Sequence, residues 1–211
     1  FEYAEQPSPD GLAQAFIIGE KFIGNDSACL VLGDNIFYGA GFNQMLHQAV
    51  VDAEQNNTAT VFGYRVGDPE RYGVAEFDEQ GNCLSIEEKP EHPKSNLASM
   101  GIYIFNYKTL RKYLLQDDKN PDSSHDFGKD IIPTYLNDHR RLAAYRFKGY
   151  WKDVGTVDSL WESNMDLLES NNQLDLGDQG WKIYTENINS LPTYIGDEAK
   201  INNAYITQGS I

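Results

Sequence analysis

An apolar run that ends in an acidic turn constrains the fold of this chain more than any other stretch. Residues 28–32 are all apolar and are followed directly by Gly33, Asp34 and Asn35. Continuous apolar runs of this length are typical of buried strands, and open α/β sheets bind their ligands where such strands end. We therefore predict a buried strand over 28–32 and place the Asp34 carboxylate at the rim of a sheet, where it can hold a metal ion.

A second aspartate stands in a comparable turn much later in the chain. The segment 149–156 reads Gly-Tyr-Trp-Lys-Asp-Val-Gly-Thr, so that Asp153 is flanked by glycines. Taken alone, Asp34 is better explained as a turn-capping residue. The matching pair changes this interpretation, because carboxylate oxygens suit Mg²⁺. We predict that Asp34 and Asp153 meet in space and share one divalent cation.

The composition excludes some functions and leaves others open. The chain has 211 residues, of which 40% are hydrophobic, and a formal net charge of −15. That length suffices for one large domain or one and a half. The strong acidity argues against a nucleic-acid partner, which requires a basic surface. It is compatible with an anionic small substrate, because a local cluster of Lys, Arg and Mg²⁺ can hold phosphates on an acidic protein.

The cysteines and the short apolar stretches indicate a cytoplasmic location. Cys29 and Cys83 lie far apart in apolar contexts, which indicates no disulfide framework and fits a reducing cytosol. No stretch approaches membrane-spanning length, and no signal peptide is visible. We therefore expect a cytoplasmic protein without a membrane partner.

Strand-like and helix-like patterns alternate along the chain. They predict strands at 1–6, 28–32, 58–65, 102–105 and 142–147, a hairpin of 74–77 with 83–88, and helices over 12–19, 42–56, 109–115, 156–168 and through Tyr135. Such alternation predicts an α/β fold whose sheet is mostly parallel with an antiparallel excursion. The last long helix should be N-capped by Thr156 and carry Asp158 in its first turn.

The C-terminal part of the chain differs in character. Residues 171–189 are polar with isolated aromatics and are interpreted as a linker. Beyond them, a small residue precedes an isoleucine by two positions at Ile201, Ile206 and Ile211. This repeat resembles the first coils of a parallel β-helix, although its spacing is five rather than six. The chain starts without Met and stops within the pattern, so we expect further sequence on both sides.

Three other features have two interpretations each. The loop 6–15 is an ordinary strand–loop–helix crossover when taken alone, but its backbone N–H groups can also receive a ligand atom. Glu87-Glu-Lys-Pro90 is either a solvated charged turn or a carboxylate and an ammonium aimed at sugar hydroxyls and phosphate. His125 is most simply a loop residue, since no second His or Cys stands at metal-ligand spacing. For Tyr150 and Trp151, core packing is favoured over substrate stacking.

Taken together and in order, the motifs indicate a particular protein family. Gln6–Ala15, Leu32–Asn35, Arg71–Gly73, Glu87–Pro90 and Trp151–Thr156 closely resemble the sugar-1-phosphate nucleotidyltransferases, or nucleotide-sugar pyrophosphorylases. The resemblance implies a Rossmann-like mixed, mostly parallel sheet flanked by helices, the nucleotide-diphospho-sugar transferase fold, followed by the start of a left-handed parallel β-helix. It also implies a catalytic domain over 1–170, a linker over 171–190 and a β-helix start over 191–211, with the first incomplete at its N-terminus and the last at its C-terminus.

The relative that the chain resembles changes near residue 96, and we call this point the seam. Residues 1–96 resemble glucose-1-phosphate thymidylyltransferase, as in the loop 6–15 and in Gly33–Gly39. Residues from 96 onward resemble bacterial glucose-1-phosphate adenylyltransferase, as in Ser95–Tyr103 and His125–Pro133. Because the two relatives share a fold, a hybrid can fold. An engineered chimera, a natural mosaic and a composite sequence all remain open.

The resemblance also implies a reaction and a role for particular residues. A sugar-1-phosphate oxygen attacks the α-phosphorus of a nucleoside triphosphate and expels pyrophosphate, which needs alignment and charge neutralisation. Asp34 and Asp153 would hold Mg²⁺, and Gln6 and Gly11 would contact the base. The sugar phosphate would be held by Tyr72, Gly73, Glu88, Lys89, Ser99 and Gly101, with Lys89 on its phosphate and Lys152 a weaker candidate.

The implied substrates are glucose 1-phosphate and a nucleoside triphosphate, with dTTP favoured and ATP next, in carbohydrate or glycogen biosynthesis. We expect a homo-oligomer in the full-length protein. The family's Gly-rich signature loop, which bears a catalytic Arg and Lys, has no counterpart in these 211 residues, so we expect this segment alone to be inactive. The alternatives are a non-catalytic regulatory or scaffold subunit, or a truncated chimera of the same fold. A generic nucleotide-binding domain predicts that Asp34 and Asp153 do not meet.

Overall fold

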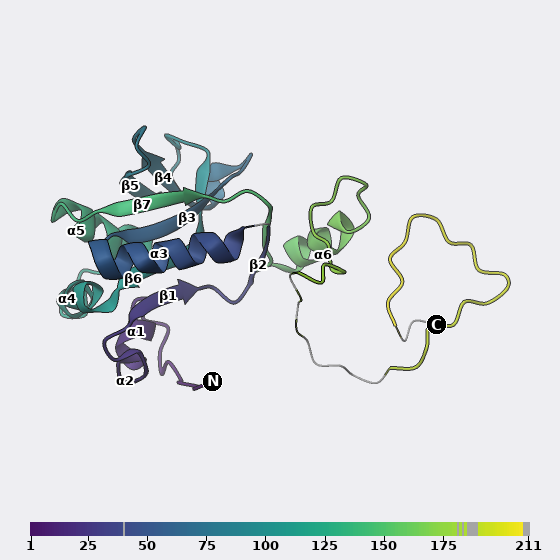
Figure 1. Ribbon diagram of the computed structural model, residues 1–211, viewed down its shortest axis with the longest axis horizontal. Coiled ribbons are helices and arrows are strands. Elements are labelled where there is room, and N and C mark those ends of the chain that lie inside the picture. The colour runs from purple at the N-terminus through teal and green to yellow at the C-terminus, as the bar shows by residue number, and fades with distance from the viewer. Residues whose placement is uncertain (40, 181, 183, 185–189, 209–211) are drawn as a thin grey trace. The chain divides into compact units, whose positions relative to one another are not determined.

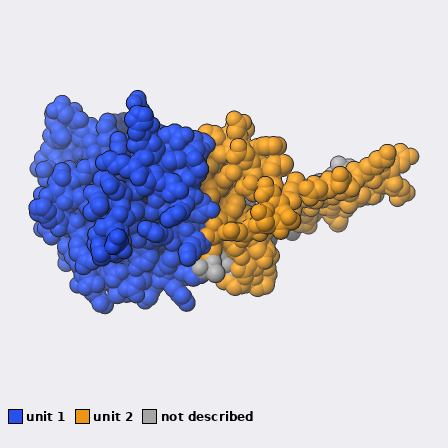
Figure 2. All heavy atoms as spheres, turned by 90° about the horizontal axis from the view of Figure 1, so that it is seen from above, with its two compact units in different colours: residues 1–33, 41–148 blue, residues 34–40, 149–211 orange. Residues whose placement is uncertain are grey.

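The computed structural model describes residues 1–39, 41–180, 182, 184 and 190–208 (Figure 1). Contacts divide the chain into two compact units, coloured blue and orange in Figure 2. Unit 1 comprises Phe1–Gly33 and Gly41–Lys148, and unit 2 comprises Asp34–Ala40 and Gly149–Ile211. The predicted division at residues 170 and 190 stays a prediction.

Unit 1 is built on a six-stranded sheet. Its strands are β1 (Ser27–Val31), β3 (Ala59–Arg65), β4 (Gly73–Phe77), β5 (Cys83–Glu88), β6 (Leu97–Asn106) and β7 (Leu142–Arg146). The order is β5-β4-β6-β3-β7, and β1 also pairs with β6. The predicted α/β class, with a mixed sheet flanked by helices, is confirmed. The share of parallel pairs is lower than predicted, because β6 runs antiparallel to β1, β3 and β4, and β3–β7 is parallel.

Helices accompany this sheet (Figure 1). They are α1 (Gln14–Ile18), α2 (Glu20–Ile23), α3 (Phe42–Asn56), the short 3-10 helix η1 (Pro69–Arg71), α4 (Tyr107–Asp117), the π-helix η2 (Phe127–Ile131) and α5 (Ile132–Asn137). The predicted helix 42–56 is confirmed, because Phe42, Ala49 and Ala53 form its buried face. Among the helices that the structure describes, none is long and apolar enough to cross a membrane.

An aromatic cluster at the centre of unit 1 holds η2 against the sheet. The Phe127 ring lies 5.5 Å from the rings of both Phe16 and Tyr103, and 5.9 Å from that of Phe105. Phe127 is only 1% exposed. Burying such rings stabilises the fold by several kcal/mol in all, at about 25 cal/mol per Å² of apolar surface. The packing therefore fixes the position of Asp126, which N-caps η2 by accepting from the Lys129 N–H.

Three local predictions need correction. Residues 1–6, all of which the structure describes, form no strand; the side chains of Phe1 and Tyr3 are exposed, and a strand needs a ladder partner. Strand β1 is antiparallel to β6 and only half-buried rather than a fully buried strand, since Cys29 and Val31 are exposed. The helix predicted over 12–19 is shorter, because α1 covers Gln14–Ile18 and ends at Gly19, after which α2 follows as a separate short helix.

Unit 2 contains a two-stranded antiparallel ladder and one helix. Strands β2 (Asn35–Tyr38) and β8 (Tyr150–Asp153) pair with Asn35 opposite Asp153. Helix α6 (Val157–Asp166) follows, and its predicted N-cap is confirmed. Thr156 and Ser159 form a capping box in which each side chain bonds the other's backbone N–H at 3.2 Å.

The predicted start of a β-helix stays a prediction. Residues 190–208, which the structure describes, form no strand. Hydrogen bonds join the two ends of this stretch: the Thr193 hydroxyl donates to the carbonyl of Thr207 at 2.8 Å, and the Gln208 side-chain amide donates to the carbonyl of Ser190 at 3.3 Å. The third repeat, 209–211, and part of the predicted linker lie outside the described residues.

Candidate functional site

The two aspartates predicted to meet are brought together by the ladder of unit 2. Asp153 is the last residue of β8, and Asp34 directly precedes β2. Because β2 and β8 are antiparallel, the end of β8 lies beside the start of β2, with Asn35 opposite Asp153. The Val154 N–H then donates to the carbonyl of Asp34 at 2.8 Å, which extends the ladder by one more bond. We call Asp34 and Asp153 the aspartate pair.

The carboxylates of the aspartate pair face the same small space beside Gly155. A Cβ atom added to Gly155 would lie 3.0 Å from Asp34 Oδ2 and 3.1 Å from Asp153 Oδ1. Carboxylates from two distant segments of the chain therefore approach one point beside Gly155. The missing side chain of Gly155 keeps that space open, which gives this glycine a function in addition to its place in the turn.

Hydrogen bonds within unit 2 orient both carboxylates. The Asn35 side-chain amide donates to Asp34 Oδ1 at 2.9 Å, and the Trp151 indole N–H donates to Asn35 Oδ1 at 2.9 Å. The Gly155 backbone N–H donates to Asp153 Oδ1 at 2.9 Å. Trp151 is buried, as predicted from its packing role. Asn35 was not predicted as a site residue; its position between two candidate groups is visible only once the ladder is known.

The donor set fits Mg²⁺. This ion commonly takes one or two carboxylates from the protein and completes its octahedron with water and substrate phosphates. Among the residues that the structure describes, no group of three or more His, Cys, Asp or Glu side chains could hold a metal ion. The aspartate pair thus offers the partial, all-oxygen coordination that Mg²⁺ accepts. The metal role of the pair stays a prediction.

A second group of predicted residues gathers on neighbouring strands of unit 1. Gly73 on β4 pairs with Glu88 on β5. A Cβ atom added to Gly73 would lie 2.9 Å from Glu88 Oε2 and 3.8 Å from the Cβ of Ser99 on β6. The Ser99 hydroxyl lies 2.8 Å from the Tyr103 hydroxyl. We call Gly73, Glu88, Ser99 and the nearby Asp126 the Glu88 cluster.

Asp126 belongs to this cluster although the sequence reasoning did not select it. A Cβ atom added to Gly128 would lie 3.4 Å from Asp126 Oδ1 and 3.6 Å from Glu88 Oε2. Burial and the negative charge of Asp126 raise the pKa of Glu88, while Lys89 works in the opposite direction. The available signal was Asp126 directly before the apolar start of a helix, and this signal indicates an N-cap as readily as a site.

Tyr72 and Lys89 lie at the edge of the cluster. The Lys89 N–H donates to the Tyr72 carbonyl at 3.0 Å, and Lys89 has a φ of 48°, in the left-handed region. The Lys89 ammonium lies 3.8 Å from Glu88 Oε1, with its side chain 67% exposed. At that exposure the ion pair contributes little to stability, so the ammonium can reach a bound anion at small cost.

Gly101 is placed differently from the other predicted sugar-phosphate residues. Its φ is 69°, and an added Cβ would lie 2.7 Å from the Leu32 side chain. Its N–H makes a long hydrogen bond of 3.4 Å to the Ser99 hydroxyl. The structure therefore gives Gly101 a packing role beside Leu32, which directly follows β1, and joins it to the cluster through the hydroxyl of Ser99.

The predicted base-binding residues form a loop of unit 1 that rests on His125. The Gln6 amide donates to the Gly11 carbonyl at 3.0 Å and to the Gln14 side chain at 2.8 Å. Gly11 has a φ of 109°, and an added Cβ would lie 2.5 Å from the His125 carbonyl oxygen. That same carbonyl accepts from the Ala13 N–H at 3.2 Å. A glycine is therefore required at position 11 on both conformational and steric grounds.

His125 is itself held by a carboxylate. Its Nδ1 lies 2.7 Å from Asp117 Oδ2. This hydrogen bond raises the pKa of His125, and burial only partly offsets it. His125 is thus the loop residue that the sequence indicated, but one that supports the segment carrying Gly11.

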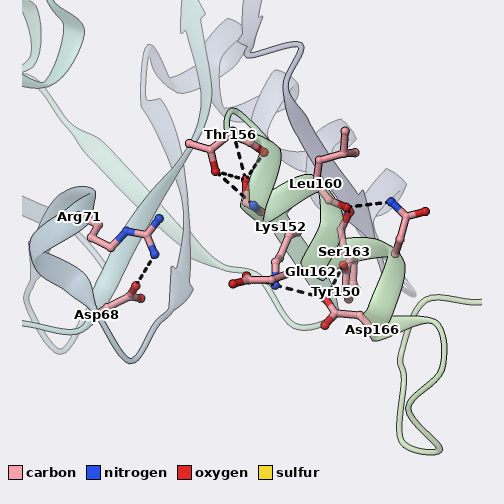
Figure 3. A network of polar contacts seen from close by, with 11 residues as sticks. Asp68, Arg71, Tyr150, Lys152, Thr156, Leu160, Glu162, Ser163 and Asp166 are labelled. Carbon is pink, nitrogen blue, oxygen red and sulfur yellow. Dashed lines mark hydrogen bonds and ion pairs between the residues drawn. The ribbon is translucent and has the colours of Figure 1, made fainter.

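Lys152, the weaker phosphate candidate, is paired with helix α6 of its own unit (Figure 3). Its ammonium lies 3.2 Å from Glu162 Oε2 and 3.4 Å from Asp166 Oδ2. Burial acts to lower the pKa of Lys152, but the hydrogen bond to Glu162 and the charges of Asp166 and Glu162 outweigh it and raise that pKa.

Comparisons with known proteins agree with these motifs. A family model described as nucleotidyl transferase matches residues 1–170. A glucose-1-phosphate adenylyltransferase of Clostridium botulinum (strain Alaska E43 / Type E3) is 49% identical over 182 residues, which cover 85% of this chain and 46% of the relative. Proteins of the same name from Geobacillus stearothermophilus and Bacillus subtilis (strain 168) are 46% and 45% identical, over 89% and 86% of this chain and 48% of each relative.

The chain spans about half the length of these curated relatives. An aligned stretch of 182 residues in a chain of 211 must include most of residues 1–96. The similarity to proteins named adenylyltransferase therefore extends across the seam near residue 96. The family match covers most of the chain and confirms the resemblance that the ordered motifs predicted: the chain belongs to the nucleotidyl transferase family.

Proposed function

We propose that this chain carries the substrate-binding and metal-binding part of a glucose-1-phosphate nucleotidyltransferase. The reaction joins glucose 1-phosphate to a nucleoside triphosphate and releases pyrophosphate. The observation that carries the proposal is the approach of Asp34 Oδ2 and Asp153 Oδ1 to one point beside Gly155, in a chain of this family. A generic nucleotide-binding domain gives no reason for these two side chains to meet.

The aspartate pair would hold Mg²⁺, which when bound neutralises phosphate charge and orients the reacting groups. The protein's own contribution is preorganisation. Trp151 fixes Asn35, which in turn fixes the Asp34 carboxylate, and the Gly155 N–H fixes that of Asp153. Such outer hydrogen bonds hold ligand groups in place before the ion arrives.

The Glu88 cluster would bind the sugar phosphate. The Glu88 carboxylate accepts hydrogen bonds from sugar hydroxyls, and the Ser99 hydroxyl can donate or accept. Gly73 leaves room for the sugar, because any side chain there would meet Glu88. The exposed Lys89 ammonium supplies a positive charge for the phosphate. Displacement at phosphorus depends mainly on such positioning and charge neutralisation.

For the nucleotide we propose ATP, with dTTP as the alternative. The thymidylyltransferase resemblance of residues 1–96 favoured dTTP. The relatives reported above are named adenylyltransferases, and their alignments include most of that segment. The base would bind at the loop of Gln6 and Gly11.

The test uses the Bacillus subtilis relative with its aligned segment replaced by this chain, which we call the grafted enzyme. Pyrophosphate release is measured with glucose 1-phosphate and either ATP or dTTP, with and without Mg²⁺. We expect Mg²⁺-dependent turnover, faster with ATP. Faster turnover with dTTP would reverse the nucleotide assignment. A folded grafted enzyme that binds glucose 1-phosphate but releases no pyrophosphate would favour the non-catalytic alternative.

A further inference from the structure

Four side chains of unit 2 join strand β8 to helix α6 (Figure 3). The Lys152 ammonium contacts the carboxylates of Glu162 and Asp166, and the Tyr150 hydroxyl donates to Asp166 Oδ2 at 2.8 Å. The side chains of Lys152 and Asp166 are 25% and 27% exposed, so this ion pair is less screened than an ordinary surface pair. We call Tyr150, Lys152, Glu162 and Asp166 the α6 clamp.

The clamp and the aspartate pair use opposite faces of one strand. Side chains alternate along a strand, so Tyr150 and Lys152 project from one face of β8, and Trp151 and Asp153 from the other. Asp166 is the last residue of α6. The far end of the helix is therefore tied to the same four-residue strand that ends in Asp153.

The near end of the helix is tied to the loop that carries Gly155. The Thr156–Ser159 capping box begins α6 directly after Gly155, whose N–H holds the Asp153 carboxylate. A helix that shifts against β8 would carry Thr156 with it and move the Gly155 N–H away from Asp153 Oδ1. The space in which the two carboxylates meet thus depends on where α6 lies.

We propose that Lys152 is a positioning residue for the aspartate pair: its ion pairs with Glu162 and Asp166 hold α6 on β8 and so keep the Gly155 loop in the geometry in which Asp34 and Asp153 share a cation. The inference rests on the proposed metal role of that pair. It replaces the interpretation of Lys152 as a phosphate contact, because its ammonium is already within 3.4 Å of two carboxylates.

The charge of Lys152 makes the proposal testable, because positioning and simple electrostatics predict opposite changes in cation affinity when that charge is removed. Lys152→Met removes a positive charge near the aspartate pair, and by electrostatics alone it should tighten cation binding. Asp166→Asn removes a negative charge and by electrostatics alone should weaken it. If the clamp positions the loop, both substitutions weaken binding, since either one releases α6.

The experiment titrates Mn²⁺, followed by electron paramagnetic resonance, into the 211-residue chain. We expect Lys152→Met and Asp166→Asn each to raise the Mn²⁺ Kd about tenfold, the usual size of an outer-shell effect. Lys152→Arg, which keeps a cation between the two carboxylates, should restore most of the affinity. Tyr150→Phe, which changes no charge, should weaken binding in the same direction but less.

The matched control is Lys94→Met. The Lys94 ammonium lies 3.8 Å from Glu76 in unit 1, with its side chain 65% exposed. Its substitution removes the same charge and should leave the Mn²⁺ Kd unchanged. Circular dichroism of each variant shows whether the fold persists. If Lys152→Met does not fold, Tyr150→Phe still decides, because it changes no charge and should weaken Mn²⁺ binding only if the clamp positions the loop.

Two results would overturn the inference while leaving the proposed metal site intact. The first is tighter Mn²⁺ binding by Lys152→Met together with weaker binding by Asp166→Asn. The second is an unchanged Mn²⁺ Kd with a raised KM for glucose 1-phosphate or ATP in the grafted enzyme, which would make Lys152 a phosphate contact. Asp153→Asn separates the two levels: if it leaves Mn²⁺ binding unchanged, the metal site itself is wrong, and the inference falls with it.

Discussion

The aspartate pair and the Glu88 cluster are assembled by the same device but supported in different ways. In each, an antiparallel pairing places a carboxylate opposite a residue of another strand: Asp153 opposite Asn35, from a distant segment, and Glu88 opposite Gly73, from the same hairpin. The aspartate pair stands on a ladder of two four-residue strands and is oriented by hydrogen bonds. The Glu88 cluster stands on a six-stranded sheet backed by buried aromatic rings.

This difference separates function from stability. A site oriented by a few hydrogen bonds can lose a carboxylate without losing buried apolar area, so its fold should survive. A site backed by a packed core depends on atoms that also stabilise the unit. A substitution in that core should therefore weaken ligand binding and lower the free energy of unfolding together. The predictions below test that separation.

The largest effect should follow removal of a charge from the aspartate pair. Asp153→Asn in the grafted enzyme should lower kcat/KM about a thousandfold, the equivalent of about 4 kcal/mol of lost charge stabilisation. The free energy of unfolding should change by less than about 0.5 kcal/mol. Pyrophosphate release and urea denaturation measure the two quantities.

Asp158→Asn is the matched control for this prediction, because Asp158 is an exposed aspartate in the first turn of α6. It should cost a few tenths of a kcal/mol in helix stability and leave the rate unchanged. A comparable loss of rate in both variants would mean that net charge, rather than the aspartate pair, controls the reaction.

The next largest effect should be on stability, in unit 1. Phe127 is 1% exposed and contacts three other aromatic rings. Phe127→Ala should lower the free energy of unfolding by about 3–5 kcal/mol, because it leaves a cavity in the core. It should also weaken glucose 1-phosphate binding, since Asp126 is the adjacent residue. Denaturation and calorimetric titration provide the measurements.

The control for the core substitution is Leu84→Ala, at a side chain that is 54% exposed. Its cost should stay below about 1 kcal/mol. If Phe127→Ala proves equally mild, the Glu88 cluster is not supported by packing, and the contrast between the two regions fails.

Alanine substitutions of two glycines, one in each region, should have effects of moderate size on ligand binding. An added Cβ would meet Asp34 Oδ2 and Asp153 Oδ1 at Gly155, and Glu88 Oε2 at Gly73. Gly155→Ala should raise the Mn²⁺ Kd about tenfold and leave glucose 1-phosphate binding unchanged. Gly73→Ala should weaken glucose 1-phosphate binding and leave the Mn²⁺ Kd unchanged, because it displaces the Glu88 carboxylate.

Gly67→Ala is the control for both, because nothing lies within 4 Å of its added Cβ. It should alter neither Kd. If Gly155→Ala and Gly73→Ala each weaken both ligands, the metal site and the sugar-phosphate site are not separate, and the proposed division of roles is wrong.

The sequence predicted best what local patterns determine. The periodic apolar face of α3, the hairpin of β4 with β5 and the N-cap at Thr156 are each decided by residues close in the chain, and all three are confirmed. The family followed from several weak motifs in a fixed order, which also required no knowledge of the fold.

What the sequence missed depends on distant pairing. Strand β2 has four residues and exists because β8 pairs with it, so no local pattern distinguishes it from a loop. The same register places Asn35 between Trp151 and Asp34. The sequence did not reveal the place of Asp126 beside Glu88 or the ion pairs of Lys152 for a related reason. Their neighbours, Glu88 for the first and the carboxylates of α6 for the second, come from other elements.

The smallest effect should show whether electrostatics also holds the segment that carries Asp126. The adjacent His125 contacts Asp117, and the charges of Asp118 and Asp130 act in the same direction to raise its pKa above 6.5. A raised pKa in the folded state means that protonated His125 contributes stability below pH 6.5, and that this contribution is lost as the pH rises through the folded pKa.

His125→Asn tolerates the left-handed φ of 54° and removes the titration. The difference in unfolding free energy between the native chain and this variant should therefore be largest in acid and should shrink toward alkaline pH, as measured by urea denaturation across the range. Asp117→Asn should remove the same pH-dependent part. A difference that stays constant with pH would mean that packing alone holds this segment, which would sharpen the contrast with the hydrogen-bonded aspartate pair.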